Sequence, residues 1–287
     1  MAQRPTKAQR LAAAREADRL AHAEAQKRLK RRRILVPAIV TAAIAVVAVI
    51  IAVIVINQPG PATERVSASA GPANMNTGGI AFQAVPDGGV QPVSTPALAA
   101  NTLPTARQWP GTGKVDHIRL YVDWTCPACK SFEEDNLDTI MSRVASGSAT
   151  LEVFPISILG NAYSTDFSLR ATNAAACVAD TAPDAFLDAQ KAMYAAQPEE
   201  GSAGLSDTEI LDVLHGAGVP ASVDACVTGG TFSDWVSVST QRITGTAALN
   251  GPLAGGGTGF STPTLVVNDV RWDRTTDATE FIRTGKN

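Results

Sequence analysis

The stretch Ile118-Arg119-Leu120-Tyr121-Val122-Asp123-Trp124-Thr125-Cys126-Pro127-Ala128-Cys129-Lys130 decides the fold of this chain. Residues 118–122 alternate as a half-buried β-strand does, and the pattern breaks at residues 123–125. From residue 130 to 142 the periodicity is helical. The apolar side of this helix carries Phe132, Leu137, Ile140 and Met141, and we expect Glu133, Glu134 and Asp135 on the opposite side. The stretch therefore predicts a strand, a turn with two cysteines and an amphipathic helix.

The two-residue gap between Cys126 and Cys129 places both sulfur atoms in the first turn of the predicted helix. We expect the Cys126 thiol to face solvent and the Cys129 thiol to turn inward behind it. Unpaired N–H groups and the positive end of the helix dipole stabilise a thiolate at Cys126 and lower its pKa. Pro127 fits the first helical position, because its missing N–H would have no partner there. The motif indicates thiol–disulfide exchange.

The N-terminal part of the chain predicts a membrane anchor. Residues 1–33 form a basic segment of net charge +8, so residues 34–287 carry −11. Residues 34–56 are 23 uncharged and mostly Ile, Val or Ala residues, enough to cross a bilayer as one helix. The basic segment should stay in the cytoplasm and the C-terminal bulk outside it. A cleaved signal peptide is the alternative, but its apolar region is usually only 7–15 residues long. Because the large domain is acidic, we expect no nucleic-acid partner.

The rest of the chain divides into a linker and one domain. Residues 57–77 are rich in Pro, Ala, Ser, Gly and Asn and predict a flexible linker. The domain, residues 78–287, has strand patterns at 80–85, 90–93, 118–122, 150–154, 264–267 and 270–272, helical patterns across about 163–250, and a last helix at 276–283. This order predicts an α/β fold with an all-helical insertion.

A resemblance can be stated at this point. Residues from about 78 to 287 resemble the DsbA-type branch of the thioredoxin superfamily, in the membrane-anchored form common among Gram-positive bacteria and actinobacteria. The segments that carry it are 123–130, 174–177 (Ala-Ala-Ala-Cys) and 259–268 (Gly-Phe-Ser-Thr-Pro-Thr-Leu-Val-Val-Asn). The resemblance implies an α/β thioredoxin fold with an all-helical insertion, preceded here by a single N-terminal transmembrane helix.

The resemblance also implies roles for particular residues. Cys126 is the nucleophile that forms a mixed disulfide with a client thiol, and Cys129 resolves it, with Pro127 and Ala128 between them. The Thr262–Pro263 peptide is implied to be cis and to pack against the active-site sulfurs, which leaves the Thr262 backbone free to pair with an extended client. An ordinary trans proline at the start of a strand is the alternative.

The four cysteines all follow the apolar run, and their even number suggests two disulfides in an oxidising compartment. The simplest interpretation of Cys177 and Cys226 is a structural disulfide that links two parts of the helical insertion. Two buried free thiols or a second redox pair are the alternatives. A zinc site is disfavoured, because no second close pair of Cys or His follows the motif. We expect neither a metal nor a cofactor.

Three neighbours of the motif are open to two interpretations. Trp124 is either a hydrophobic platform for the client or a core residue. The strand carries Leu120 where many relatives place a buried acid used in proton transfer, and Asp123 is a weak substitute candidate. Lys130 adds a positive charge nearby, although a lysine at such a position is usually solvated.

The sequence therefore predicts a membrane-anchored, extracytoplasmic oxidase that donates its disulfide to newly exported proteins containing cysteine. The resemblance implies that a quinone-coupled membrane protein re-oxidises it. The first alternative is a reductase or isomerase of the same fold. The second is a non-catalytic tethered scaffold in which Cys126 and Cys129 are only structural.

Overall fold

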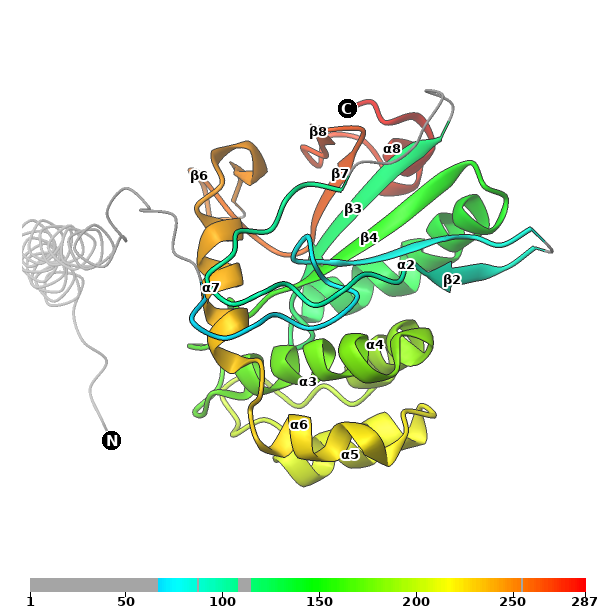
Figure 1. Ribbon diagram of the computed structural model, residues 1–287. Coiled ribbons are helices and arrows are strands. Elements are labelled where there is room, and N and C mark those ends of the chain that lie inside the picture. Colours follow the sequence, from blue (N-terminus) through cyan, green and yellow to red (C-terminus); the bar gives the residue numbers. More distant parts are fainter. Residues whose placement is uncertain (1–66, 87, 108–114, 254) are drawn as a thin grey trace, which may run out of the picture. The chain divides into compact units, whose positions relative to one another are not determined.

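The computed structural model describes residues 67–86, 88–107, 115–253 and 255–287 (Figure 1). The predicted basic segment, the apolar run 34–56 and residues 57–66 of the predicted linker lie outside these residues. Within the described ranges, no helix combines the length and the apolar character that a membrane crossing needs. The transmembrane helix stays a prediction from the sequence.

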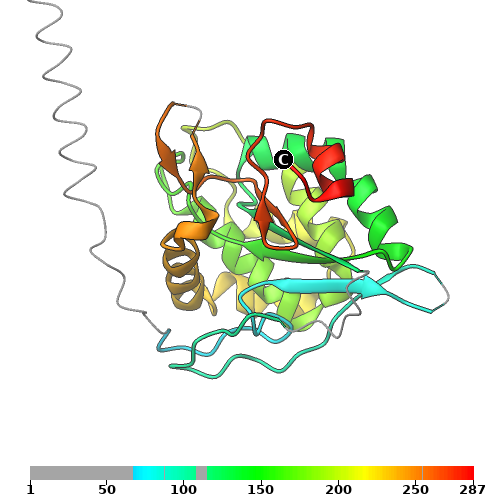
Figure 2. The same cartoon turned by 90° about the horizontal axis from the view of Figure 1, so that it is seen from above.

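A six-stranded mixed sheet forms the centre of the domain, in the order β2-β1-β4-β3-β7-β8. Its strands are β1 (Ile80–Ala84), β2 (Val90–Pro92), β3 (Asp116–Val122), β4 (Ala149–Pro155), β7 (Thr264–Val267) and β8 (Val270–Arg271). β3 pairs in parallel with β4 and antiparallel with β7. The β1–β2 and β7–β8 hairpins therefore form the two edges, and Figure 2 shows them on opposite sides of the green central strands.

The parallel pair β3–β4 needs a crossover, and α2 (Pro127–Ala145) supplies it. A block of helices then separates β4 from β7. It contains α3 (Phe167–Thr181), α4 (Phe186–Ala195), α5 (Asp207–Gly216), α6 (Asp224–Thr228) and α7 (Ser233–Thr244), with short 3₁₀ turns between them. The chain ends with α8 (Ala278–Thr284), and β5 (Gly251–Pro252) and β6 (Thr258–Gly259) form a small separate ribbon. This order agrees with the α/β pattern and the helical insertion that the sequence predicts.

Alternating residues of the central strands pack on the two faces of the sheet. Leu120 and Val122 belong to the large core, which also contains buried side chains of α2, α3, α4 and α8. Tyr121 belongs to a smaller cluster with Phe154 and with Ile243 of α7. Because side chains of a strand point to opposite faces in turn, both faces of β3 are covered. This burial fixes the end of β3, where the cysteine motif begins.

Residues 67–77 differ from the flexible linker predicted for residues 57–77. Met75 is fully buried, the Asn74 side chain donates a hydrogen bond to the Ala179 carbonyl at 2.8 Å, and the Ser67 hydroxyl donates to Asp234 at 2.7 Å. These partners lie more than 100 residues away on α3 and α7. Local composition predicts a tether, but these distant contacts hold the end of the segment against the domain.

Candidate active site

The two cysteines of the motif lie at the start of α2, as predicted. Cys126 is the N-cap residue, with φ −87° and ψ 118°, and Pro127 follows in the first turn. The backbone N–H groups of Cys129 and Lys130 both donate to the Cys126 carbonyl at 3.1 Å. Both thiols are free. A residue with extended backbone before the first helical turn directs its side chain toward the unpaired N–H groups of that turn.

The expectation that the Cys126 thiol faces solvent is wrong, because this side chain is largely buried. Cys126 is only 6% exposed, while Cys129 is 1% exposed. Of two residues distant in sequence, one contacts the first thiol and the other binds the backbone beside it. The Thr262 carbonyl accepts a hydrogen bond from the Cys126 sulfur at 3.8 Å, and the Gln197 amide donates to the carbonyls of Trp124 and Cys126 at 3.1 Å. Cys126 nevertheless retains more exposure than Cys129, so the inward turn of the second thiol agrees with the expectation.

The surroundings separate the acidities of the two thiols. The side-chain hydrogen bond with Cys129 lowers the pKa of Cys126 to about 6 against the opposing effect of burial, with help from the Thr262 side chain and the Cys129 backbone N–H. Burial, together with the hydrogen bond to Cys126, raises the pKa of Cys129 well above its ordinary value. The pair therefore consists of a stable thiolate at Cys126 and a thiol at Cys129 that resists ionisation.

The loop before β7 forms one wall of the site. The Thr262–Pro263 peptide is cis, in agreement with what the resemblance implies, and Thr262 is 8% exposed. Pro263 and Ala128 both line a pocket of about 550 Å³, together with Phe132, Trp272, Arg274 and parts of α2 and α8. The exposed half of the motif thus opens directly onto a hollow surface.

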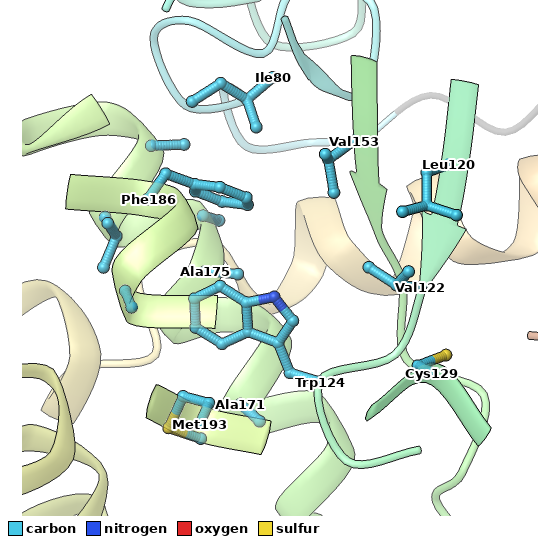
Figure 3. Close-up of a cluster of buried hydrophobic side chains, with 14 of the residues drawn as sticks. Ile80, Leu120, Val122, Trp124, Cys129, Val153, Ala171, Ala175, Phe186 and Met193 are labelled. Atoms are coloured by element: carbon cyan, nitrogen blue, oxygen red, sulfur yellow. The ribbon is translucent and has the colours of Figure 1, made fainter. Parts of the chain in front are cut away.

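Trp124 is a core residue and not an exposed platform for a client. Its side chain is fully buried, and its ring centroid lies 5.5 Å from that of Phe186. Figure 3 shows it pointing away from Cys129 into a cluster with Phe186, Met193 and small residues of α3. The indole N–H donates to the Gln190 side-chain oxygen at 3.0 Å. Of the two interpretations left open by the sequence, the structure supports core packing.

Asp123 ties the end of β3 to the segments around it. Its carboxylate accepts five hydrogen bonds, and it is fully buried. The donors are the backbone N–H groups of Thr125, Ile158 and Leu159 and the hydroxyls of Thr125 and Ser168, at 2.7–3.1 Å. Burial raises its pKa, and the hydrogen bonds act against that rise. A carboxylate held by this many donors fixes the turn that carries Cys126.

The sequence predicts Glu133 on the solvent side of the helix, and this prediction is wrong. It is only 7% exposed, and its carboxylate accepts a hydrogen bond from the Gln190 side chain at 2.5 Å. Burial raises the pKa of Glu133 to about 7. The spacing could have revealed it, since a residue four positions after the buried Cys129 lies on the same helix face. Its partner, 57 residues further along the chain on α4, has no local signal.

A disulfide joins Cys177 of α3 to Cys226 of α6. Cys177 is fully buried in the helical block. This is the disulfide that the sequence predicts. Because Cys177 and Cys226 are bonded to each other, neither of them is bonded to Cys126 in this structure. Leu120, which occupies the position of the expected buried acid, is 1% exposed and belongs to the large core.

A cysteine pair at the start of a helix that follows a central strand, with a cis-proline loop against it, defines a site for thiol–disulfide exchange. Residues 110–284 match the family model described as Thioredoxin. Reduced DsbA from Mycobacterium tuberculosis is 26% identical, with a TM-score of 0.50 over 62% of this chain and 85% of that one. The reduced disulfide bond oxidoreductase DsbG from the same organism is also 26% identical, with a TM-score of 0.50 over 62% and 80%.

MdbA, a thiol-disulfide oxidoreductase from Corynebacterium diphtheriae, is 14% identical with a TM-score of 0.50 over 80% of this chain and all of that one, which shows a likeness of fold. A search among curated proteins gave no match. The chain belongs to the thioredoxin family, and within it to the DsbA-like thiol–disulfide oxidoreductases.

Proposed function

We propose that this protein is an extracytoplasmic, membrane-tethered oxidase that introduces disulfides into exported proteins through Cys126 and Cys129. The observation that carries the proposal is the opposite shift of the two thiol pKa values, down to about 6 for Cys126 and well upward for Cys129. A stabilised thiolate favours the reduced form of the enzyme, so its disulfide form is a stronger oxidant. This favours the oxidase over the reductase or isomerase alternative.

The reaction takes place in two exchanges. A client thiolate attacks the Cys126 sulfur of the oxidised enzyme, the bond to Cys129 breaks, and Cys129 leaves with the electron pair and takes up a proton. A second client thiolate then attacks the client sulfur bonded to Cys126. Cys126 leaves as its stable thiolate, and the client carries a new disulfide. Two electrons pass from the client to the enzyme, so a further oxidant must restore the enzyme disulfide.

The pocket beside the motif is where we place the client chain. It is lined by Ala128 and Pro263 next to the sulfurs, and by Phe132 and Trp272 further away. These side chains offer apolar contact to an extended segment whose own cysteine lies at Cys126. Such a segment is available in an exported protein that has not yet folded.

The tether and the compartment are inferred from the sequence. The apolar run 34–56 and the basic residues before it favour a single span with the N-terminus in the cytoplasm. The Cys177–Cys226 disulfide fits an oxidising compartment. A membrane protein coupled to quinones is the re-oxidant that we propose, because the thiolate-stabilised reduced enzyme needs an oxidant within reach of the bilayer.

A trapping experiment tests the proposal. The Cys129→Ser protein cannot form its own disulfide, but its Cys126 thiolate can still attack a disulfide of a client and release one client thiolate. Because the Cys129 thiol is then missing and cannot displace the client from Cys126, we expect covalent complexes with exported proteins to accumulate in cells. They should disappear on reduction and be absent from the Cys126→Ser/Cys129→Ser double variant. An empty trap would support the non-catalytic scaffold instead. A redox titration against glutathione separates oxidase from reductase, since known potentials range from about −120 mV for strong oxidants to about −270 mV for thioredoxin.

A further inference from the structure

Three consecutive backbone carbonyls just before α2 accept hydrogen bonds from side chains of the segment between β4 and β7. The Gln197 side-chain amide donates to the carbonyls of Trp124 and Cys126, each at 3.1 Å. The Tyr163 hydroxyl donates to the carbonyl between them, that of Thr125, at 3.0 Å. Tyr163 precedes α3, and Gln197 follows α4. The motif is therefore bound by side chains that lie 38 to 73 residues further along the chain.

Two loops carry these side chains, and the loops are bonded to each other. We call residues 160–165 and 197–204 the paired loops. The Gly201 N–H donates to the Ala162 carbonyl at 2.7 Å, and two further hydrogen bonds, of 2.9 and 2.6 Å, join the same loops. Because the loops are linked in this way, they present the amide and the hydroxyl to the motif as one unit.

Packing against α3 fixes the paired loops. The Tyr163 ring lies 5.0 Å from the Phe167 ring in an edge-to-face contact at 85°, and Tyr163 is only 6% exposed. Gly204 has a φ of +72°, and a Cβ atom at this position would lie 2.3 Å from the Phe167 side chain. Only glycine therefore lets the second loop approach α3 so closely. The buried ring holds the Tyr163 hydroxyl in one place.

The hydrogen bonds to these carbonyls bear on the charge of the Cys126 sulfur. A carbonyl oxygen carries a partial negative charge, so near a cysteine it either accepts the S–H or repels the thiolate, and both effects favour the neutral thiol. A carbonyl that already binds an N–H or O–H group exerts both effects less strongly. The Cys126 sulfur is hydrogen-bonded to the Thr262 carbonyl, on the opposite wall of the site.

We propose that Gln197 and Tyr163 are positioning residues for Cys126, an inference that rests on the proposed function. They bind the carbonyls of the turn before α2, so that these carbonyls neither take the Cys126 proton nor repel its thiolate. In the second exchange Cys126 leaves the client sulfur as a thiolate, and the two side chains stabilise this leaving group through the backbone. The segment between β4 and β7 therefore takes part in the chemistry in addition to its role in packing.

The test measures how fast iodoacetamide alkylates Cys126 in the purified, reduced full chain at a series of pH values. For the unmodified protein we expect half of the maximal rate near pH 6. Gln197→Met keeps a side chain of similar length and removes both donors, so the half-maximal pH should rise by about one unit. The equilibrium with glutathione at pH 8 should then move about tenfold toward the enzyme disulfide, because the reduced form is less stabilised. Gln241→Met, the same change at an exposed position of α7, is the matched control and should alter neither quantity.

Tyr163→Phe tests the second donor, and it decides the question if Gln197→Met does not fold. It keeps the ring contact with Phe167 and removes only the hydroxyl, so the half-maximal pH should rise by about half a unit. If both variants lower the melting temperature but keep the alkylation profile of the unmodified protein, the two residues are only structural. That result would overturn the positioning role and leave the proposed function intact. A half-maximal pH near the ordinary value of 9.0 in the unmodified protein would instead remove the basis of the proposed function, and the positioning role with it.

Discussion

At the scale of single residues, the site depends on which of the two cysteine sulfurs carries a negative charge. Cys126 and Cys129 have the same chemistry in a free chain, yet the first shares hydrogen bonds with Thr262 and with the start of α2, whereas the second faces the core. The position in the first helical turn therefore assigns one thiol as thiolate and the other as thiol. This asymmetry gives a direction to the exchange and also makes stability depend on the redox state.

The pH dependence of stability should differ between the redox forms. Cys126 has a pKa of about 6 in the folded reduced protein, against an ordinary value of 9.0. Because the folded value is depressed, ionisation stabilises the folded reduced form fully above pH 9, and this stabilisation is lost as the pH falls through 6. The oxidised form has no such thiol. We expect the free energy of unfolding of the reduced form, relative to the oxidised form, to grow by about 2 kcal/mol between pH 6 and 8.

Urea denaturation of both forms at pH 6, 7 and 8 measures this difference. Glu133 acts in the opposite direction, since its raised pKa stabilises the fold at low pH and this contribution is lost as the pH rises through 7. It is present in both redox forms, so the comparison removes most of its effect. A difference that stays constant with pH would show that Cys126 is not a stabilised thiolate.

Asp123 should contribute to the stability of the fold through its hydrogen-bond network. Asp123→Asn replaces one carboxylate oxygen by an NH₂ group. This group cannot accept a hydrogen bond from the N–H or O–H groups of Thr125, Ile158 or Ser168 that it would face. We expect a loss of about 3 kcal/mol in the free energy of unfolding, as for other broken buried networks. Urea denaturation measures this loss, and a loss below about 1 kcal/mol would show that the hydrogen bonds of Asp123 do not hold the turn.

At the scale of elements, the helical block is held together by a covalent link as well as by packing. The Cys177–Cys226 disulfide joins residues 49 positions apart, from the buried face of α3 to the short α6. A helix as short as α6 has little stability of its own. The disulfide and the Asn173 side chain, which donates to the carbonyls of Cys226 and Val227, hold this helix against α3.

Removal of this disulfide should destabilise the domain without changing its chemistry. For Cys177→Ala/Cys226→Ala we expect a loss of about 4 kcal/mol in the free energy of unfolding, from the chain-entropy model for a loop of this length. The alkylation rate of Cys126 at pH 7 and 15 °C should not change, because the motif depends on β3 and α2. Urea denaturation measures the first quantity and iodoacetamide labelling the second. A loss below 1 kcal/mol would mean that packing alone holds α6.

The strands and the motif could be predicted because their signals are local. The alternation at residues 118–122 predicts the core of β3. The strand patterns at 264–267 and 270–272 predict β7 and β8, and Asn268 and Asp269, both with positive φ, form the turn between them. Exposure at the site could not be predicted in the same way. Glu133 is buried by Gln190, and Cys126 is covered by Thr262, 136 residues further along the chain. Such contacts depend on tertiary packing, which a pattern within one element does not contain.

At the scale of the whole molecule, the placement of the cysteines provides a test of the proposed topology. All four follow the apolar run 34–56, and two of them form the Cys177–Cys226 disulfide. Cys126 and Cys129 are therefore the only free thiols of the reduced protein, and Cys126 has the thiolate that reacts with maleimides near neutral pH. Its labelling reports on which side of the membrane the domain lies.

With the domain outside the cytoplasm, a membrane-impermeant maleimide should label Cys126 in intact spheroplasts after mild reduction, to the same extent as after lysis. The Cys126→Ser/Cys129→Ser variant should remain unlabelled in both samples, which controls for the disulfide cysteines. The charge distribution supports this orientation, because residues 1–33 carry +8 and the remainder carries −11. Deletion of residues 1–56 should abolish export, since the apolar run would also be the export signal. Labelling that occurs only after lysis would place the cysteine pair in the cytoplasm, where glutathione and thioredoxin keep thiols reduced and an oxidase would have no function.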